Sequence, residues 1–320
     1  MARARQASLD GTVLQLRSHE VWSALEATDP VATMAEYLIG RVVRATGHGR
    51  RSPGRLSSWR ELGADGAELV LLDVPDAPGP CVVPAQSLRD SVAAALTAVA
   101  ARELLMSAGV TMAVFGPAGV AQPQLAVVAR HVPDISHVAL CSASMGTEHV
   151  EPRLADQLEL SGIGLSVVPT VAEAVFGANL VIATDHTATA NDLAELRIDQ
   201  LARGALLVNA TGTDLPSDLV DQVDQIYVDD MGLLDHYPER DVVAAHQAEP
   251  AGGGVVTRSA TDRRITSDLA QLLTGRHSVR RGTGDIVLVE LLGVRELNAD
   301  LAYRIYEVAT HTGLGVRTAN

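Results

Sequence analysis

The feature that most restricts the fold of this 320-residue chain is a series of short apolar runs that alternate with helical segments after Val110. Each run is only a few residues long and therefore fits a buried strand better than a helix. The runs are Thr111–Phe115, His137–Cys141, Val167–Val168, Leu180–Ala183, Ala205–Asn209, Gln225–Val228 and Ile286–Glu290. Such alternation is typical of a parallel sheet with helices on both faces. The sequence therefore predicts an α/β fold with a doubly wound parallel sheet.

A glycine-bearing turn joins the first of these runs to a helix predicted over Val120–His131. Its sequence, GPAGVA, matches the pattern G-x-G-x-x-G/A at the first and last positions. Backbone N–H groups and the helix N-terminus at such a turn can bind a dinucleotide pyrophosphate. Alanine replaces the middle glycine, which leaves open a turn without a nucleotide role. The expected cofactor contacts here are Gly116, Pro117, Ala118, Gly119 and Val120.

The second mark of a dinucleotide site is an acidic residue about 20 residues further on, which holds the adenine ribose. In this chain the strand predicted over His137–Cys141 is followed by Ser142 instead. A serine hydroxyl can hydrogen-bond a ribose or a 2′-phosphate, but no adjacent arginine supports NADP. The sequence therefore predicts NAD or NADP as cofactor without deciding between them.

The first hundred residues mix helices, loops and short strands. A helix is expected to begin at Asp29-Pro30, where a side-chain acceptor precedes a proline, and to end at Gly47. The segment Gly47–Arg60 is rich in Arg, Ser, Gly and Pro and is predicted as a loop. The other predicted elements are strands over Glu68–Asp73 and Cys81–Val83, a helix over Ser87–Ser107 and a terminal helix over Asn298–Thr312.

Composition argues against several classes of function. The formal net charge of −14 makes nucleic acid and anionic membranes poor partners. The two cysteines, Cys81 and Cys141, lie outside any CxxC, which argues against a disulfide framework and a zinc site. All 25 basic residues are arginine, so a lysine Schiff base and a P-loop lysine are excluded. Because no long apolar segment follows the N-terminus, a soluble cytoplasmic protein is expected.

Several segments in order resemble the ornithine cyclodeaminase/μ-crystallin family. They are Ser52–Arg55, Val208–Asp214, Tyr227–Asp230, Leu269–Asp285 and the closing stretch Leu292–Val316. The resemblance implies a Rossmann-type domain over residues 110–290. It also implies a discontinuous α+β domain for substrate binding and homodimer formation over residues 1–109 and 291–320. The implied activity is hydride transfer between NAD or NADP and the C–N bond of an amino acid or imine, with the cofactor carrying the difficult step.

The resemblance also assigns roles to polar residues. Asp214 falls on the family's catalytic aspartate, which handles protons; the alternative is a cap for a helix expected over Ser217–Val223. Arg55 is expected to clamp a substrate carboxylate, with a solvated loop arginine as the alternative. Arg89 lies one helical turn before Val92, which aligns with a second family arginine, and is a further substrate candidate. The strand ends add Thr184, Asp185, Asn209, Thr211 and Gly212 as expected cofactor contacts.

Two departures from the family pattern affect the expected substrate. The family's active-site lysine has no counterpart, and its Gly-Lys-x-Glu segment after Asp214 is deleted. Fewer cationic contacts argue against ordinary ornithine cyclodeamination and favour another amino acid or imine, in a specialised biosynthetic pathway. The alternative is a catalytically degenerate member that binds a nucleotide or small ligand, or serves as a dimeric interaction protein. Asp229 and Asp230 are expected to organise a strand end rather than to act as acids or bases.

Overall fold

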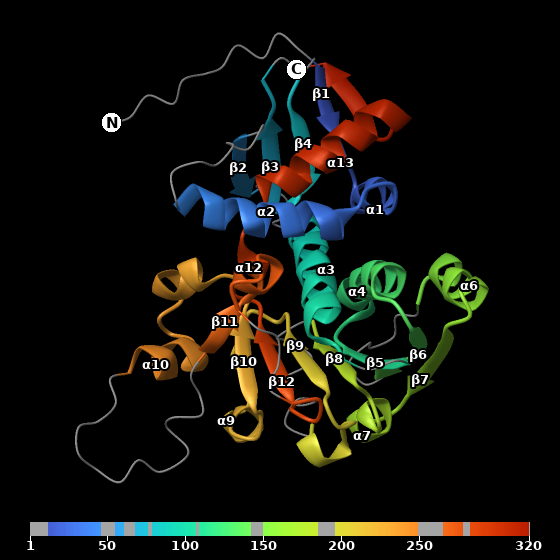
Figure 1. Cartoon of the computed structure of the whole chain (residues 1–320). Helices are drawn as coiled ribbons and strands as arrows, with labels where there is room; N and C mark the ends of the chain where they lie inside the picture. The colour runs from blue at the N-terminus through green and yellow to red at the C-terminus, as the bar shows by residue number, and fades with distance from the viewer. Residues whose placement is uncertain are drawn as a thin grey trace. The chain divides into compact units, whose positions relative to one another are not determined.

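The computed structural model describes residues 12–45, 55–60, 68–75, 79–106, 109–141, 150–184, 196–248, 265–277 and 282–319. The chain forms two compact units (Figure 1). The terminal unit consists of Met1–Thr33, Arg50–Val92 and Glu296–Asn320, and the central unit of Met34–Gly49 and Ala93–Arg295. Two helices, α2 (Pro30–Ala45) and α3 (Ala85–Leu104), begin in the terminal unit and end in the central unit.

The central unit contains an eight-stranded sheet in which all neighbouring strands are parallel. The strand order is β11-β10-β12-β9-β8-β5-β6-β7. The strands are β5 (Val110–Phe115), β6 (Ile135–Cys141), β7 (Gly164–Val168), β8 (Leu180–Ala183), β9 (Leu206–Asn209), β10 (Gln225–Val228), β11 (Ile265–Asp268) and β12 (Val287–Glu290). Because β6 lies on one side of β5 and β8 on the other, the winding of the chain reverses between β5 and β8. The predicted doubly wound parallel sheet is confirmed.

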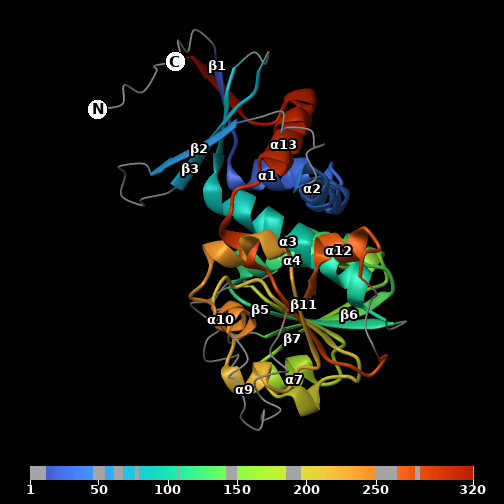
Figure 2. The same cartoon turned by 60° about the vertical axis from the view of Figure 1, so that its left-hand side comes forward.

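Helices cover both faces of this sheet, as buried parallel strands require. Figure 2 shows α4 and α12 on one side of the strands and α7 and α9 on the other. The helical elements are α4 (Ala118–His131), α6 (Pro152–Leu160), α7 (Val171–Val175), α9 (Ser217–Val220), α10 (Asp241–Gln247), α12 (Leu269–Leu273), and the 3-10 turns η1 (Ile198–Gln200), η2 (Met231–His236) and η3 (Leu292–Arg295). None of the helices that the structure describes combines the length and the apolar composition needed to cross a bilayer.

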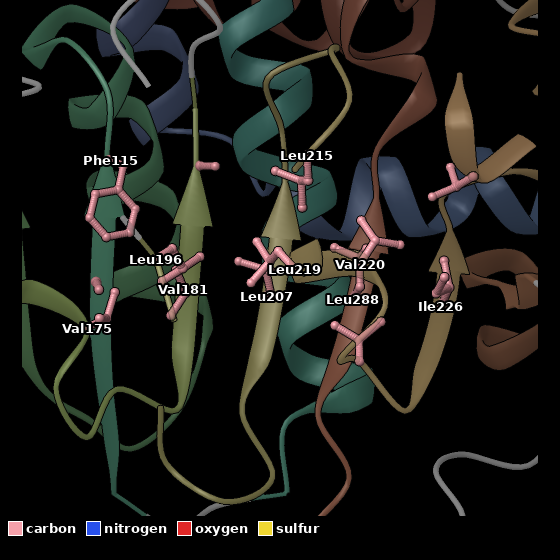
Figure 3. Packing of buried hydrophobic residues seen from close by; sticks show 14 of the residues in the cluster. Phe115, Val175, Val181, Leu196, Leu207, Leu215, Leu219, Val220, Ile226 and Leu288 are labelled. Atoms are coloured by element: carbon pink, nitrogen blue, oxygen red, sulfur yellow. The ribbon is translucent and has the colours of Figure 1, made fainter. Parts of the chain in front are cut away.

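One apolar layer of the central unit is shown in Figure 3. Alternate residues of a strand point to the same face of a sheet. The strands contribute Phe115, Val181, Leu207, Ile226 and Leu288 to this layer. The segments packed against them contribute Val175, Leu196, Leu215, Leu219 and Val220. Burial of each such side chain stabilises the fold by roughly 1.5–3 kcal/mol. Packing in this layer therefore fixes how the strands are aligned along their axes, and with this the positions of the strand ends.

The terminal unit is built on a five-stranded sheet of order β13-β1-β4-β3-β2. Its strands are β1 (Thr12–Gln15), β2 (Arg55–Arg60), β3 (Glu68–Asp73), β4 (Cys81–Pro84) and β13 (Val316–Ala319). Strand β1 pairs with β13 antiparallel and with β4 parallel, so the first and last described strands are neighbours. The helices α1 (Ser18–Glu26) and α13 (Ala299–Thr312) pack against each other. The predicted terminal helix is confirmed, with Asn298 as its N-cap.

The prediction of a loop over Gly47–Arg60 is wrong for Arg55–Arg60, which forms strand β2. This strand pairs antiparallel with β3 along its whole length. The gain from pairing with β3 outweighs a composition that by itself favours a loop. The helix start at Asp29 is confirmed, since Oδ1 of Asp29 accepts a hydrogen bond from the Ala32 N–H at 2.9 Å. The expected helix stop at Gly47 lies outside the described residues.

Candidate functional site

The turn between β5 and α4 stands where the sequence predicts it. β5 ends at Phe115 and α4 begins at Ala118. Gly116 has a φ of 137°, a backbone conformation that side-chain-bearing residues rarely adopt. Pro117 is the N-cap of α4, and its side chain offers no acceptor to the N–H groups of the first turn. The turn therefore has the strand-to-helix backbone geometry at which an anionic group such as pyrophosphate can bind.

The first turn of α4 leaves space beside Gly119. A Cβ atom placed on this glycine meets no heavy atom of the described residues within 4 Å. The N–H groups of the next two residues, Val120 and Ala121, both donate to the carbonyl of Pro117, at 3.0 and 2.9 Å. These two N–H groups are therefore used within the helix. The side chain of Ala118 is not among those that the structure describes. Close approach of a ligand to this turn is thus possible on the Gly119 side.

Thr184 ties the end of β8 to the end of β5. Its Oγ1 donates a hydrogen bond to the carbonyl of Phe115 at 2.7 Å, and its N–H donates to the same oxygen at 2.9 Å. The hydroxyl proton of this buried threonine is therefore used within the protein. Thr184 fixes the backbone just before Gly116, at the point where the winding of the sheet reverses.

The residues after β9 form a turn that satisfies its own polar groups. Nδ2 of Asn209 donates to the carbonyl of Thr213 and to Oε2 of Glu290, both at 2.8 Å. Oδ1 of Asn209 accepts from the N–H and the hydroxyl of Thr211, at 3.1 and 2.7 Å. Gly212 completes the turn with a left-handed φ of 71°. Asn209 and Thr211 thus use their side chains to shape the turn that carries Asp214.

Asp214 does not cap the helix that follows it. The N-cap of α9 is Pro216, which accepts no side-chain hydrogen bond. Instead, Oδ1 of Asp214 accepts from Nε of Arg240 at 2.9 Å and from the N–H of Asp241 at 3.0 Å. The side chain remains 34% exposed. The carboxylate is therefore held through one oxygen and accessible to a small molecule.

Arg240 connects Asp214 to a second, buried carboxyl group. Its Nη2 donates to Oε2 of Glu290 at 2.6 Å and to the carbonyl of Thr213 at 2.9 Å. The side chains of Arg240 and Glu290 are 5% and 1% exposed. Burial raises the pKa of Glu290 to about 7, although the charge of Arg240 opposes the shift. The sequence did not predict either residue as part of the site.

Further carboxylates at the same edge of the sheet hold the backbone. Asp229 accepts from the N–H groups of Leu292 and Gly293, each at 2.8 Å, and its burial raises its pKa to about 7. Asp230 accepts from the Gly232 N–H at 2.7 Å and forms an ion pair with Arg41 at 2.7 Å. These contacts agree with the structural role expected for the two aspartates.

Comparison with known families identifies the chain. The profile of the ornithine cyclodeaminase/mu-crystallin family matches residues 65–313, which is more than half of the 320 residues. The chain belongs to this family. The resemblance expected from the sequence is thereby confirmed. A comparison with curated protein sequences finds no match.

Solved structures related to the family share its fold with this chain. The Δ1-pyrroline-2-carboxylate reductase of Thermococcus litoralis, in complex with NADH and L-proline, has a TM-score of 0.64 at 15% identity, over 95% of this chain and 100% of that one. CmnK has a TM-score of 0.63 at 18% identity, over 96% and 98%. An archaeal alanine dehydrogenase dimer with bound NAD has a TM-score of 0.60 at 16% identity, over 96% and 99%. At these identities the likeness establishes the fold.

The remaining family positions expected from the sequence are only partly described. Arg55 is the first residue of β2, its side chain is not described, and it precedes the range matched to the family. Arg89 forms an ion pair with Glu68 of β3 at 2.9 Å within the terminal unit. Ser142 and Asp185 lie outside the described residues. The structure thus brings together Asp214, Asn209, Thr211 and Gly212, and ties Thr184 to the turn at Gly116.

Proposed function

We propose that this protein is an NAD(P)-dependent oxidoreductase that acts by hydride transfer on the C–N bond of an amino acid or cyclic imine. The observation that carries the proposal is Asp214, an accessible carboxylate held through one oxygen at the carboxyl edge of a doubly wound parallel sheet. Ligands of such sheets bind outside the carboxyl ends of the strands, near the reversal of winding. Family membership supports the reaction class, and the reductase from Thermococcus litoralis, with its bound NADH, is a precedent for it.

The residues at the β5–α4 turn fit a dinucleotide. The φ of Gly116 and the space that the described residues leave beside Gly119 allow the backbone to approach a pyrophosphate, and Pro117, the N-cap of α4, has no side-chain acceptor that would take its place. Thr184 would act on the cofactor indirectly, by fixing the backbone before Gly116. Asn209 and Thr211 would likewise shape the site rather than donate to the cofactor, since their side-chain groups bond to each other and to the turn. The nicotinamide, when bound, supplies the hydride acceptor or donor.

Asp214 would carry the proton that accompanies the hydride. When an amine loses hydride from its carbon, the nitrogen becomes part of an iminium ion, and its N–H proton must pass to a base. The ionised carboxylate of Asp214 can take this proton, and the protonated form can return it in the reverse direction. Arg240 cannot serve as this base, because a guanidinium stays charged in proteins. Of these two residues, only Asp214 can therefore do the acid–base work.

Cofactor binding is tested first. Titration of the protein with NADH and with NADPH, followed by nicotinamide fluorescence and by thermal shift, is expected to give saturable binding of at least one. Preference for NADH or NADPH would decide between the two cofactors. Absence of binding of both at millimolar concentration would contradict the proposal.

The role of Asp214 is tested by the variant Asp214→Asn. We expect turnover of amino acids or cyclic imines, followed by NAD(P)H absorbance, to fall by about 100- to 10,000-fold. Cofactor affinity should stay unchanged, because the variant keeps the shape of the side chain. Asp218→Asn, at an exposed position of α9, is the matched control and should retain full activity. Equal turnover of wild type and Asp214→Asn would show that Asp214 has no part in proton transfer.

A second candidate is a family member that binds a nucleotide or small ligand without catalysis. The observation that favours it is the engagement of Oδ1 of Asp214 by Arg240 and the Asp241 N–H, together with the internally satisfied Asn209. This reading predicts saturable cofactor binding but no turnover of any amine or imine in a panel. Turnover that depends on Asp214 would exclude it.

The proposal extends to the terminal unit and to assembly. We assign substrate binding and homodimer formation to this unit, and Arg55 and Arg89 remain the proposed contacts of a substrate carboxylate. The archaeal alanine dehydrogenase, which was solved as a dimer, supports the assembly. Light scattering is expected to give twice the mass of one chain, and a monomer at micromolar concentration would overturn the assignment.

A further inference from the structure

The position of Arg240 is unusual for a charged residue. It precedes the first residue of α10 as the N-cap, and its side chain is 5% exposed. A buried guanidinium is costly unless its donors are paired. Here Nε and Nη2 reach Asp214, Glu290 and the carbonyl of Thr213, all within 2.9 Å. The three acceptors come from two segments, the turn after β9 and the end of β12, so Arg240 joins them.

The two carboxylates on Arg240 differ in their surroundings. Glu290 is 1% exposed and also accepts from Nδ2 of Asn209 at 2.8 Å, which fixes it on the sheet. Asp214 is 34% exposed and sits on a turn. Glu290 is therefore the anchor, and Asp214 is the group that the anchored guanidinium holds. An arginine provides two donor directions in one rigid plane, which a lysine does not.

The hydrogen bonds that position Asp214 all end on one of its oxygens. Both the Arg240 Nε and the Asp241 N–H donate to Oδ1. Within the part of the chain that the structure describes, no hydrogen bond to Oδ2 is formed. A carboxylate that is free to rotate about its Cβ–Cγ bond exchanges its two oxygens, whereas two donors on Oδ1 leave Oδ2 in a fixed direction. Fixed placement of a reacting group contributes to rate, because small displacements are costly.

We propose that Arg240 is the positioning residue of Asp214: anchored by Glu290, it holds Oδ1 and presents Oδ2 to the substrate nitrogen. This inference rests on the proposed function, in which Asp214 transfers the proton. It adds a role for a residue pair that lies 26 and 76 positions after Asp214 and that no motif of the sequence marks. It predicts that loss of Arg240 affects the rate of the chemical step rather than the binding of cofactor or substrate.

The test uses the double variant Arg240→Met/Glu290→Gln, because removal of Arg240 alone would leave a buried carboxylate without its cation. We expect thermal unfolding and NAD(P)H affinity close to those of the wild type. The turnover number kcat should fall on the order of 100-fold while KM changes little. Arg197→Met, which removes an arginine whose side chain is 69% exposed, is the matched control and should leave both constants unchanged.

A second variant, Arg240→Lys, tests the same role if the double variant fails to fold. Arg240→Lys retains the charge but lacks the planar pair of donors, so its kcat should fall below that of the wild type without a change in cofactor affinity. A kcat equal to that of the wild type in a folded double variant, or in Arg240→Lys, would overturn the positioning role. The proposed function would fail separately, through absence of cofactor binding by the wild type or through full activity of Asp214→Asn.

Discussion

Glu290 is a carboxyl group that almost no solvent reaches, and burial and its hydrogen-bond donors shift its pKa in opposite directions. Arg240 and Asn209 donate to it, but burial outweighs them and raises its pKa to about 7 from an ordinary value of 4.5. The folded chain therefore keeps a proton on Glu290 over a pH range in which the unfolded chain has lost it. Stability from this group is fully present below about pH 4.5 and is lost as the pH rises through 7.

The variant Glu290→Gln tests whether the stability contributed by Glu290 decreases as the pH rises. Since glutamine does not titrate, the free energy of unfolding of the wild type minus that of the variant should decrease between about pH 5 and about pH 8. The decrease should be on the order of 2 kcal/mol. Urea unfolding at the two pH values measures it. Glu307→Gln, at an exposed ion pair with Arg304, should show no such trend, and an increase for Glu290→Gln would contradict the pKa shift.

At this scale the sequence predicts the site only in part. Asp214 was located through the ordered segments of a family resemblance. Arg240 and Glu290 were missed, because the contacts of Arg240 with Asp214 and Glu290, and of Glu290 with Asn209, join segments that lie far apart in the sequence. Arg240 is one of 25 arginines and has no neighbouring motif, and Glu290 ends an apolar run in which a buried charge is unexpected. The adjacency of β9 and β12 brings Glu290 beside Asn209 and the turn that carries Asp214, and the start of α10 adds Arg240.

The strand–turn–helix of β5 and α4 is the element that the sequence predicts best. A short apolar run, a glycine and a helical segment are all local signals, and the structure has them in the expected order. Strand β2 was missed for the opposite reason. Its residues, RLSSWR, have no apolar alternation, and their extended conformation depends on pairing with β3. Elements that rest on local propensity were predicted, and those that rest on a distant partner were not.

Two glycines of the β5–α4 turn give opposite predictions. Gly116→Ala should destabilise the protein by about 1–3 kcal/mol and weaken NAD(P)H binding, because alanine is strained at a φ of 137°. Gly119→Ala should raise stability by up to about 1 kcal/mol, since it lies in a helix and its Cβ meets open space. If a pyrophosphate occupies that space, the same methyl group lowers cofactor affinity.

Thermal unfolding and NADH titration of the two variants separate these effects. The combination expected for Gly119→Ala, a higher melting temperature with weaker binding, cannot come from general damage to the fold. Unchanged NADH affinity in Gly119→Ala would show that the pyrophosphate does not bind at this turn, even if the protein binds the cofactor elsewhere.

On the scale of the whole molecule, both ends of the described chain belong to the terminal unit. β1 and β13 pair from Thr12–Ala319 to Gln15–Val316, so this sheet joins segments that lie about 300 residues apart in the chain. The central unit is formed largely by one continuous stretch, Ala93–Arg295. The two tryptophans of the chain, Trp22 and Trp59, both lie in the terminal unit. Tryptophan fluorescence therefore reports on that unit alone, whereas far-ultraviolet circular dichroism reports on both.

The closing contact of β13 on β1 is tested at Gly315. A Cβ atom there would lie 2.5 Å from Cδ2 of Leu16 and 2.8 Å from the carbonyl oxygen of Gln15, and the φ is 85°. Gly315→Ala should therefore cost about 2–5 kcal/mol from strain and overpacking together. Gly313→Ala is the matched control, since its φ is 74° but its Cβ meets nothing within 4 Å, and strain alone should cost about 1–2 kcal/mol.

Urea unfolding followed by tryptophan fluorescence should give a lower midpoint for Gly315→Ala than for Gly313→Ala. If the two units unfold separately, the part of the circular dichroism signal that belongs to the central unit should keep its wild-type midpoint in both variants. Equal fluorescence midpoints would show that the β1–β13 contact adds no stability beyond the backbone strain. A common shift of fluorescence and circular dichroism would show instead that the two units unfold together.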